Sequence, residues 1–181
     1  MDPLLRTTVL KLATPAAGVA VLLAVTRLRG VSWCDDVGFR RPAASRALGW
    51  LGLWVAWMLA SEALIRAFGL DQAAVWPDYA PPILVMRILA IGVLGPILEE
   101  MVMRGLLFHF LRRTAVGALG AIVIISLVWT AIHYRYGPGT LALVFADGLL
   151  FGLARHQGHS LWLPIGMHML GNLISIVQSL M

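Results

Sequence analysis

The chain has 181 residues, of which 60% are hydrophobic and only 13% are charged, and its mean hydropathy is +0.84. This composition excludes an ordinary soluble domain and predicts an integral membrane protein, while the length predicts a single domain. The formal charge of +5 does not indicate nucleic-acid binding, because the arginines lie at the ends of apolar segments and form no basic run interleaved with aromatic residues. A single cysteine, Cys34, excludes a disulfide framework and a cysteine-based metal site.

Six apolar segments approach the ~20 residues that a helix needs to cross a bilayer. They predict an all-α fold, a polytopic transmembrane helical bundle in which residues 1–181 form one domain. The first segment is too long for a signal peptide and is closed by arginines, so we expect it to be a retained span. The segments cover about 7–28, 47–68, 83–111, 116–133, 140–154 and 161–181, with polar loops between them at 30–46, 69–82 and 155–160.

The third segment carries two adjacent carboxylates, Glu99 and Glu100, together with Arg104, in apolar surroundings. A charge at membrane depth costs several kcal/mol, so it persists only when it is paired, hydrated or used. On a helix, Glu100 and Arg104 are i and i+4 and can form an ion pair, whereas Glu99 points roughly 100° away from Glu100. Glu99 therefore has no partner on its own helix and is the candidate for chemistry.

The same segment is longer than a bilayer requires, and it contains the pair Gly95-Pro96. At ~1.5 Å per residue it exceeds the ~30 Å hydrocarbon thickness, so it is expected to tilt, protrude or bend, and Gly95-Pro96 is the obvious place for a bend. Pro96 has no backbone N–H, so a carbonyl one turn earlier loses its helical partner. The sequence thus predicts unsatisfied polarity just before Glu99.

Three further polar side chains lie at membrane depth: His133 ends the fourth segment, and His168 and Asn172 share one face of the sixth at i and i+4. In a helical bundle, side chains from different helices can converge on one site. A carboxylate in a hydrated cavity can take a proton from water, and an imidazole can orient that water. A second imidazole and an amide can donate to a developing oxyanion. These residue types therefore favour amide hydrolysis by general-base catalysis, although each could instead be an interhelical hydrogen-bond partner.

Two other features carry no assignment to this chemistry. Asp147, at the midpoint of the fifth segment, could pair with an arginine or line the cavity. Trp50, Trp54 and Trp57 lie on one face of the second segment, a stripe that is more typical of lipid-interface anchoring or packing than of a cofactor site.

The polar residues resemble, in order, the three motifs of the CPBP family, the CAAX-protease and bacteriocin-processing (Abi) intramembrane glutamic endopeptidases. The family patterns are Glu-Glu-x-x-x-Arg, Phe-x-x-x-His and His-x-x-x-Asn or Asp, and this chain has Glu99-Glu100-x-x-x-Arg104, Trp129-x-x-x-His133 and His168-x-x-x-Asn172. The resemblance begins at about residue 82, so 82–181 is expected to be the catalytic core and 1–81 two N-terminal spans with their loops. Trp129 departs from the usual phenylalanine, and Met103 replaces an aromatic residue often found before the arginine.

The resemblance implies catalytic roles for four residues. Glu99 is expected to activate water with help from His133, and His168 and Asn172 to stabilise the oxyanion. Glu100 and Arg104 match motif positions, and their spacing suggests a supporting salt bridge.

The resemblance also implies a substrate and a location. The expected substrate is a membrane-anchored protein or peptide, and the expected location is the cytoplasmic (inner) membrane of a bacterium, with no metal cofactor. Eukaryotic CAAX proteases have more spans, so a prenylated substrate is not favoured. Three alternatives stay open: a zinc-dependent protease using the same glutamate and histidines, a non-catalytic peptide-binding immunity or scaffold protein, and proton-coupled transport through Glu99 and Asp147.

Overall fold

The computed structural model describes residues 2–70 and 76–180, and over these ranges every regular element is a helix, which confirms the all-α membrane bundle. Residues 71–75 of the predicted loop 69–82 lie outside the described residues. The elements are α1 (Pro3–Leu28), α2 (Ala44–Phe68), α3 (Pro81–Ile88), the π-helix η1 (Leu89–Leu94), α4 (Gly95–Glu100), the π-helix η2 (Met101–Leu107), α5 (Phe108–Leu111), α6 (Gly117–Ile132), α7 (Pro138–Gly158) and α8 (Trp162–Ser179).

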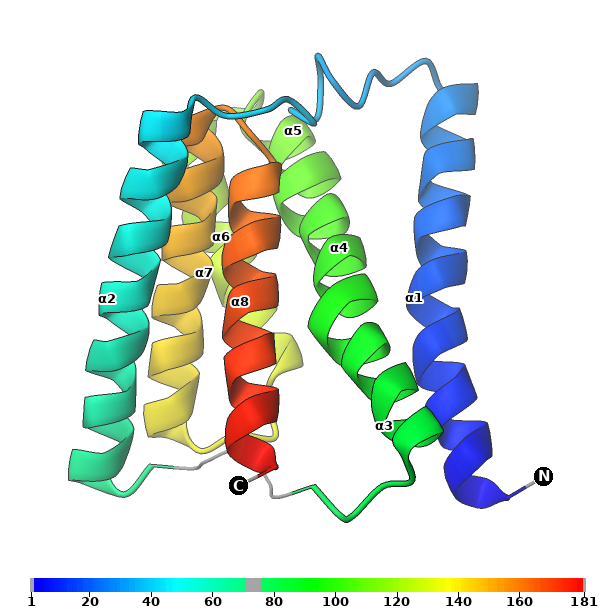
Figure 1. The fold of residues 1–181 in the computed structure, drawn as a ribbon. Coiled ribbons are helices and arrows are strands. Elements are labelled where there is room, and N and C mark those ends of the chain that lie inside the picture. Colours follow the sequence, from blue (N-terminus) through cyan, green and yellow to red (C-terminus); the bar gives the residue numbers. More distant parts are fainter. Residues whose placement is uncertain (1, 71–75, 181) are drawn as a thin grey trace.

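The third predicted span is one continuous helix of 31 residues, from Pro81 to Leu111, in which α and π segments alternate. Figure 1 shows this helix inclined between α8 on one side and α1 on the other. The N- and C-termini of the chain lie at the same end of the bundle. Gly95-Pro96 lies at the junction of η1 and α4, separated by two residues from the two glutamates. The chain thus adjusts its helical register around these residues without ending the helix.

Four of the described helices are long and apolar enough to cross a membrane: α1, α2, the helix 81–111, and α7. The apolar helix α6 is shorter, with 16 residues, and α8, with 18, carries His168 and Asn172. The sequence underestimated α7, which extends to Gly158 instead of about 154. The predicted polar turn 155–160 is wrong at its start because Arg155 is helical and buried, and its guanidinium finds a backbone acceptor.

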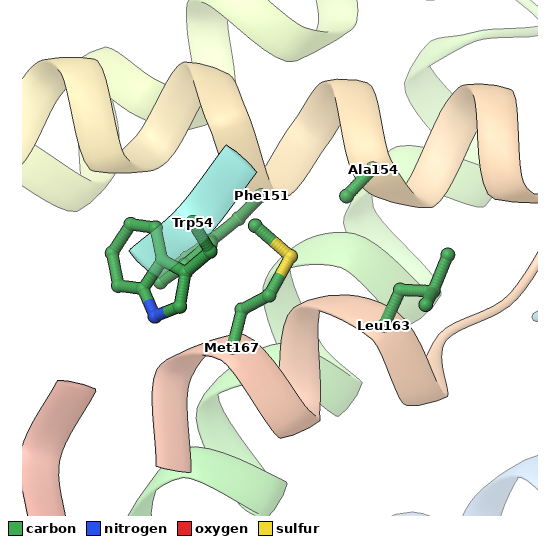
Figure 2. Packing of buried hydrophobic residues seen from close by; sticks show 5 residues of the cluster. All are labelled: Trp54, Phe151, Ala154, Leu163 and Met167. Atoms are coloured by element: carbon green, nitrogen blue, oxygen red, sulfur yellow. The ribbon is translucent and has the colours of Figure 1, made fainter. Parts of the chain in front are cut away.

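The tryptophan stripe of α2 packs into the protein. Trp54 is only 4% exposed, and its ring centroid lies 4.8 Å from that of Phe151 on α7 (Figure 2). Met167 on α8 completes this cluster, which joins α2, α7 and α8. The Trp57 indole N–H donates to Asp147 Oδ1 at 2.6 Å, so the stripe also satisfies a carboxylate at membrane depth. Of the two roles that the sequence allowed for the stripe, packing is confirmed.

The segment 29–43, here called the crossing segment, connects α1 to α2 across one end of the bundle (Figure 1). Some of its carbonyls accept hydrogen bonds within the segment, and others accept from α7 and from the residue before α8. The Val37 carbonyl accepts from Arg155 Nη2 at 2.7 Å, and the Gly38 carbonyl accepts from the Leu161 N–H at 2.8 Å. Gly38 has φ +82°, and a Cβ there would lie 2.5 Å from Arg155 Nη2, so this position requires glycine.

Helix α1 packs against α3, η1 and α4, and it leaves many apolar side chains exposed along its length, including Val21 and Leu23. In Figure 1 it stands at the opposite side of the bundle from α2. An exposed apolar surface of this kind on a membrane-spanning helix faces lipid. Helix α1 therefore forms one outer wall of the bundle, and the helix 81–111 packs against its inner side.

Candidate active site at the centre of the bundle

The two glutamates occupy a short α-helical turn, α4, with π-helix on both sides. In η1 the Gly95 N–H donates to the Ala90 carbonyl, five residues back, which is the π register. In that register the Ile91 carbonyl would accept from residue 96, but Pro96 has no N–H. The Asn172 amide fills this place, because its Nδ2 donates to the Ile91 carbonyl at 2.9 Å. The sequence predicted an unsatisfied carbonyl one turn before Pro96; in the structure the carbonyl five residues before it, that of Ile91, accepts a hydrogen bond from α8.

Glycine at position 95 allows this local geometry. A Cβ there would lie 3.0 Å from the Ala90 carbonyl oxygen and 3.9 Å from Glu99 Oε1. The first distance is tighter than ordinary van der Waals contact, so a side chain at Gly95 would push against the same carbonyl that holds the π register. The position of Glu99 relative to η1 thus depends on a residue without a side chain.

Glu100 and Arg104 form the predicted ion pair, with 2.9 Å between Arg104 Nη1 and Glu100 Oε1. Both side chains are almost completely buried, at 0% and 1% exposure. Arg104 Nη2 also donates to the Gly148 carbonyl of α7 at 3.3 Å, and the guanidinium carbon lies 5.0 Å from the Trp129 ring centroid. The pair therefore joins α4 and η2 to α6 and α7, and removing one member would leave a buried charge without compensation.

His168 lies between the two glutamates. Its Nδ1 is 3.0 Å from Glu100 Oε1, and its Nε2 is 3.8 Å from Glu99 Oε2. Because the ion-paired Glu100 carboxylate can only accept, Nδ1 carries the hydrogen, and this network assigns the tautomer. The other nitrogen, Nε2, faces Glu99 at a distance too long for a direct hydrogen bond. Glu100 and Arg104 thus fix the orientation of an imidazole toward Glu99.

His133 is placed differently. Its Nδ1–H donates to the Trp129 carbonyl at 2.8 Å within its own helix region, and its ring centroid is 4.7 Å from that of Trp129. The Trp129 ring in turn meets the His168 ring edge-on at 5.2 Å. Over the described residues, no hydrogen bond or ion pair joins His133 to Glu99. The two histidines are therefore brought together through an indole.

Glu99 and Asn172 line one open cavity of about 490 Å³ between α1, the helix 81–111 and α8. The Glu99 side chain is 44% exposed, in contrast to the fully buried Glu100 beside it. The two adjacent carboxylates are thus separated into one that is paired and one that faces the cavity. The other lining residues are Leu10, Lys11, Thr14, Pro15, Ala90, Ile91, Gly95 and Leu98.

Several contacts of this site escaped the sequence analysis. Asp147, which the sequence analysis left without an assignment, accepts a hydrogen bond from the Trp57 indole N–H. The carbonyl of the next residue, Gly148, accepts a hydrogen bond from Arg104 Nη2. Phe151 stacks on the His168 ring at 5.4 Å between centroids. A backbone carbonyl and an ordinary apolar side chain give no signal in a sequence. Trp129 was identified as the motif residue four positions before His133, but its contact with Arg104 was not predicted.

Zinc was an open alternative for these residues. Among residues 2–70 and 76–180, no group of three histidine, cysteine, aspartate or glutamate side chains is arranged to hold a metal ion.

A model of the type II CAAX prenyl endopeptidase Rce1-like family matches residues 81–174, just over half of the chain. The chain belongs to this family. The match confirms the resemblance to CAAX proteases seen in the sequence, and it runs from the start of α3 into α8. Glu99, Glu100, Arg104, His133, His168 and Asn172 lie within the matched residues, whereas α1, α2 and the crossing segment lie outside.

The Rce1-like chain is also 30% identical over 130 residues to a protein of Escherichia coli described as an uncharacterized 24.3 kDa protein. The similarity covers 64% of this chain and 59% of the relative, so the chain spans about three fifths of that relative's length. No solved structure matches the chain.

Proposed function

We propose that the protein is an intramembrane endopeptidase that hydrolyses a peptide bond of a membrane-associated protein or peptide, in the cytoplasmic membrane of a bacterium. One observation carries the proposal: an accessible carboxylate, Glu99, faces a cavity with an imidazole nitrogen 3.8 Å away, and that imidazole is held by a buried ion pair. Membership of a family of CAAX prenyl endopeptidases supports the same activity.

In the proposed reaction Glu99 is the general base. Its carboxylate takes a proton from a water molecule as the water oxygen bonds to the carbonyl carbon of the scissile peptide. The carbonyl π electrons move to the oxygen and give a tetrahedral oxyanion. When the carbon–nitrogen bond breaks, the proton held by Glu99 passes to the departing amine, which restores the Glu99 carboxylate. No side-chain nucleophile is required.

His168 and Asn172 are proposed to stabilise the oxyanion. A doubly protonated His168 can donate from Nδ1 to Glu100 and from Nε2 toward the oxyanion at the same time. The Asn172 amide has two hydrogens, and the bond to the Ile91 carbonyl uses one of them. Each such donor contributes roughly 3–4 kcal/mol of transition-state stabilisation in well-studied enzymes. The assisting role of His133 rests on its motif, since its hydrogen bond is to Trp129.

The proposal is tested by Glu99→Gln, which keeps the shape of the side chain but removes its basicity. Membrane peptides from cells with the wild type and with the variant are compared by mass spectrometry. A base of this kind contributes about 10²–10⁴-fold to the rate, so the products of cleavage should disappear. Glu62→Gln is the matched control, because Glu62 is a carboxylate on α2 that pairs with the exposed Arg66 and does not line the cavity.

Unchanged products in the Glu99→Gln variant would exclude hydrolysis by Glu99 and would favour a peptide-binding protein. The zinc alternative is tested on purified protein by a strong chelator. Loss of cleavage that added zinc restores would replace the proposed metal-free mechanism.

A further inference from the structure

Lys11 is the single lysine of the chain, and it lies on α1 in the wall of the cavity that holds Glu99. It is the ninth residue of α1, so at ~1.5 Å per residue it lies roughly 12 Å along the helix from Pro3. Helix α1 is apolar and long enough to span the membrane, so Lys11 lies within an apolar segment, where its side chain is exposed. A cation at this depth is expected to be paired, hydrated or used.

No partner in the described part of the chain neutralises Lys11. It forms no ion pair and no hydrogen bond, and Glu99 in the same cavity is not within ion-pair distance of it. Arg87, the cation at the same α1 interface, behaves differently. Arg87 Nε donates to Thr8 Oγ1 at 3.2 Å, and its guanidinium carbon lies 4.4 Å from the Tyr79 ring centroid. The structure thus provides contacts for Arg87 but leaves Lys11 available.

The remaining surface of the cavity is mostly apolar, and its polar groups are placed at separate points. Glu99 and Asn172 come from the helix 81–111 and α8, while Lys11 comes from α1. The cavity is open and has a volume of about 490 Å³, within the ~300–1,000 Å³ range of small-molecule pockets. Lys11 and Glu99 line the same cavity, so a peptide bound there would lie against both side chains.

We propose that Lys11 binds a carboxylate of the substrate, so that the substrate is an apolar peptide segment with a single negative charge within a few residues of the scissile bond. This inference rests on the proposed function. The carboxylate can be a glutamate or aspartate side chain, or the C-terminal carboxylate of the peptide. Held by Lys11 at the α1 wall, it fixes which carbonyl lies beside Glu99, and it neutralises the ammonium group in the bilayer.

The test measures binding without turnover. The full-length Glu99→Gln protein is reconstituted in nanodiscs and titrated with a short fluorescent peptide of alanine, leucine and valine, and Kd is read from fluorescence anisotropy. The peptide is made in three forms: a neutral one with an amidated C-terminus, one with a free C-terminal carboxylate, and an amidated one with one internal glutamate. The last two forms distinguish the two sources of the carboxylate.

At least one charged form should bind about tenfold or more tightly than the neutral form, because hydrogen bonds to charged groups are stronger than neutral ones. Adding Lys11→Met, which keeps the aliphatic stem, should remove this preference and leave the neutral peptide unaffected. Lys11→Arg should retain most of it. Arg6→Met removes a cation from the same helix outside the cavity lining, and it should change none of the three affinities.

Equal binding of all three forms, binding of none, or an equal loss for every form in Lys11→Met would overturn the inference. The last result would mean that Lys11 shapes α1 or reaches toward lipid headgroups. Cleavage of the preferred peptide by the protein with Glu99 intact is measured separately. Selective binding without cleavage would contradict the proposed function alone, and cleavage without charge preference would contradict the role of Lys11 alone.

Discussion

The protein contains two polar networks that use similar residue types in different surroundings. At membrane depth, the Glu100 and Arg104 side chains are 0% and 1% exposed and lie 2.9 Å apart. At the end of the bundle, where the crossing segment packs on α5, the Asp36 and Arg113 side chains are 32% and 57% exposed and lie 3.4 Å apart. One pair is isolated from water, and the other is in contact with it.

This difference determines what each pair does. Water and salt screen an exposed ion pair, which typically contributes ~0–1 kcal/mol to stability. A buried pair contributes little net stability relative to apolar residues, but breaking it costs roughly 3–5 kcal/mol because one charge is left behind. Glu100 and Arg104 therefore act mainly by fixing geometry, and the geometry that they fix is that of His168. The predictions below test this contrast.

The largest effect is expected for Arg104→Met, which leaves Glu100 buried without its partner. The variant should lose roughly 3–5 kcal/mol of stability, with thermal unfolding in detergent followed by circular dichroism. Adding Glu100→Gln removes the unpaired charge and should restore part of the stability but not the activity, because the carboxylate that orients His168 is gone. If the Arg104→Met variant were as stable as Glu62→Gln, a structural role for the ion pair would be contradicted.

An intermediate effect is expected at the π-helical segment before Glu99. Asn172→Leu removes the donor to the Ile91 carbonyl and should cost about 1 kcal/mol, because this acceptor is only partly buried. Adding Pro96→Ala supplies a backbone N–H at the position that can bond to Ile91, so the double variant should recover stability. Cleavage should remain impaired in both. Additive losses of stability in a double-mutant cycle would show that Asn172 does not compensate for Pro96.

The smallest effect is expected at the exposed end. The Ser32 backbone N–H, which donates to Asp36 Oδ2 at 3.0 Å, lowers the pKa of Asp36 below its ordinary value of 3.8, and Arg113 acts in the same direction. A lowered pKa in the folded state gives stability above pH 3.8 that is lost as the pH falls through the folded-state value. Asp36→Asn should weaken this acid dependence and leave cleavage near neutral pH unchanged. The measurement is unfolding temperature against pH, and identical curves for the two proteins would refute the expectation.

The ion pair and the orphan carbonyl were predictable because both depend on local geometry. Residues four apart on a helix share a face whatever surrounds the helix, so Glu100 and Arg104 had to be neighbours. Pro96 lacks a donor in any environment, so some carbonyl before it had to be left free. The C-terminal end of α7 was less predictable. In the sequence Arg155 looks like a polar turn residue, and only the tertiary structure shows that its guanidinium donates to the Val37 carbonyl of the crossing segment.

The sequence by itself determined that this is a helical membrane protein, which helices carry its polar groups, and which charges pair within a helix, because composition and helical periodicity act over a few residues. Only the tertiary structure decided that His168 bonds to Glu100, that Asn172 bonds to Ile91, and that Lys11 shares a cavity with Glu99. These contacts join residues far apart in the chain. They depend on how each helix is rotated and inclined against its neighbours, which the packing of many apolar side chains sets together.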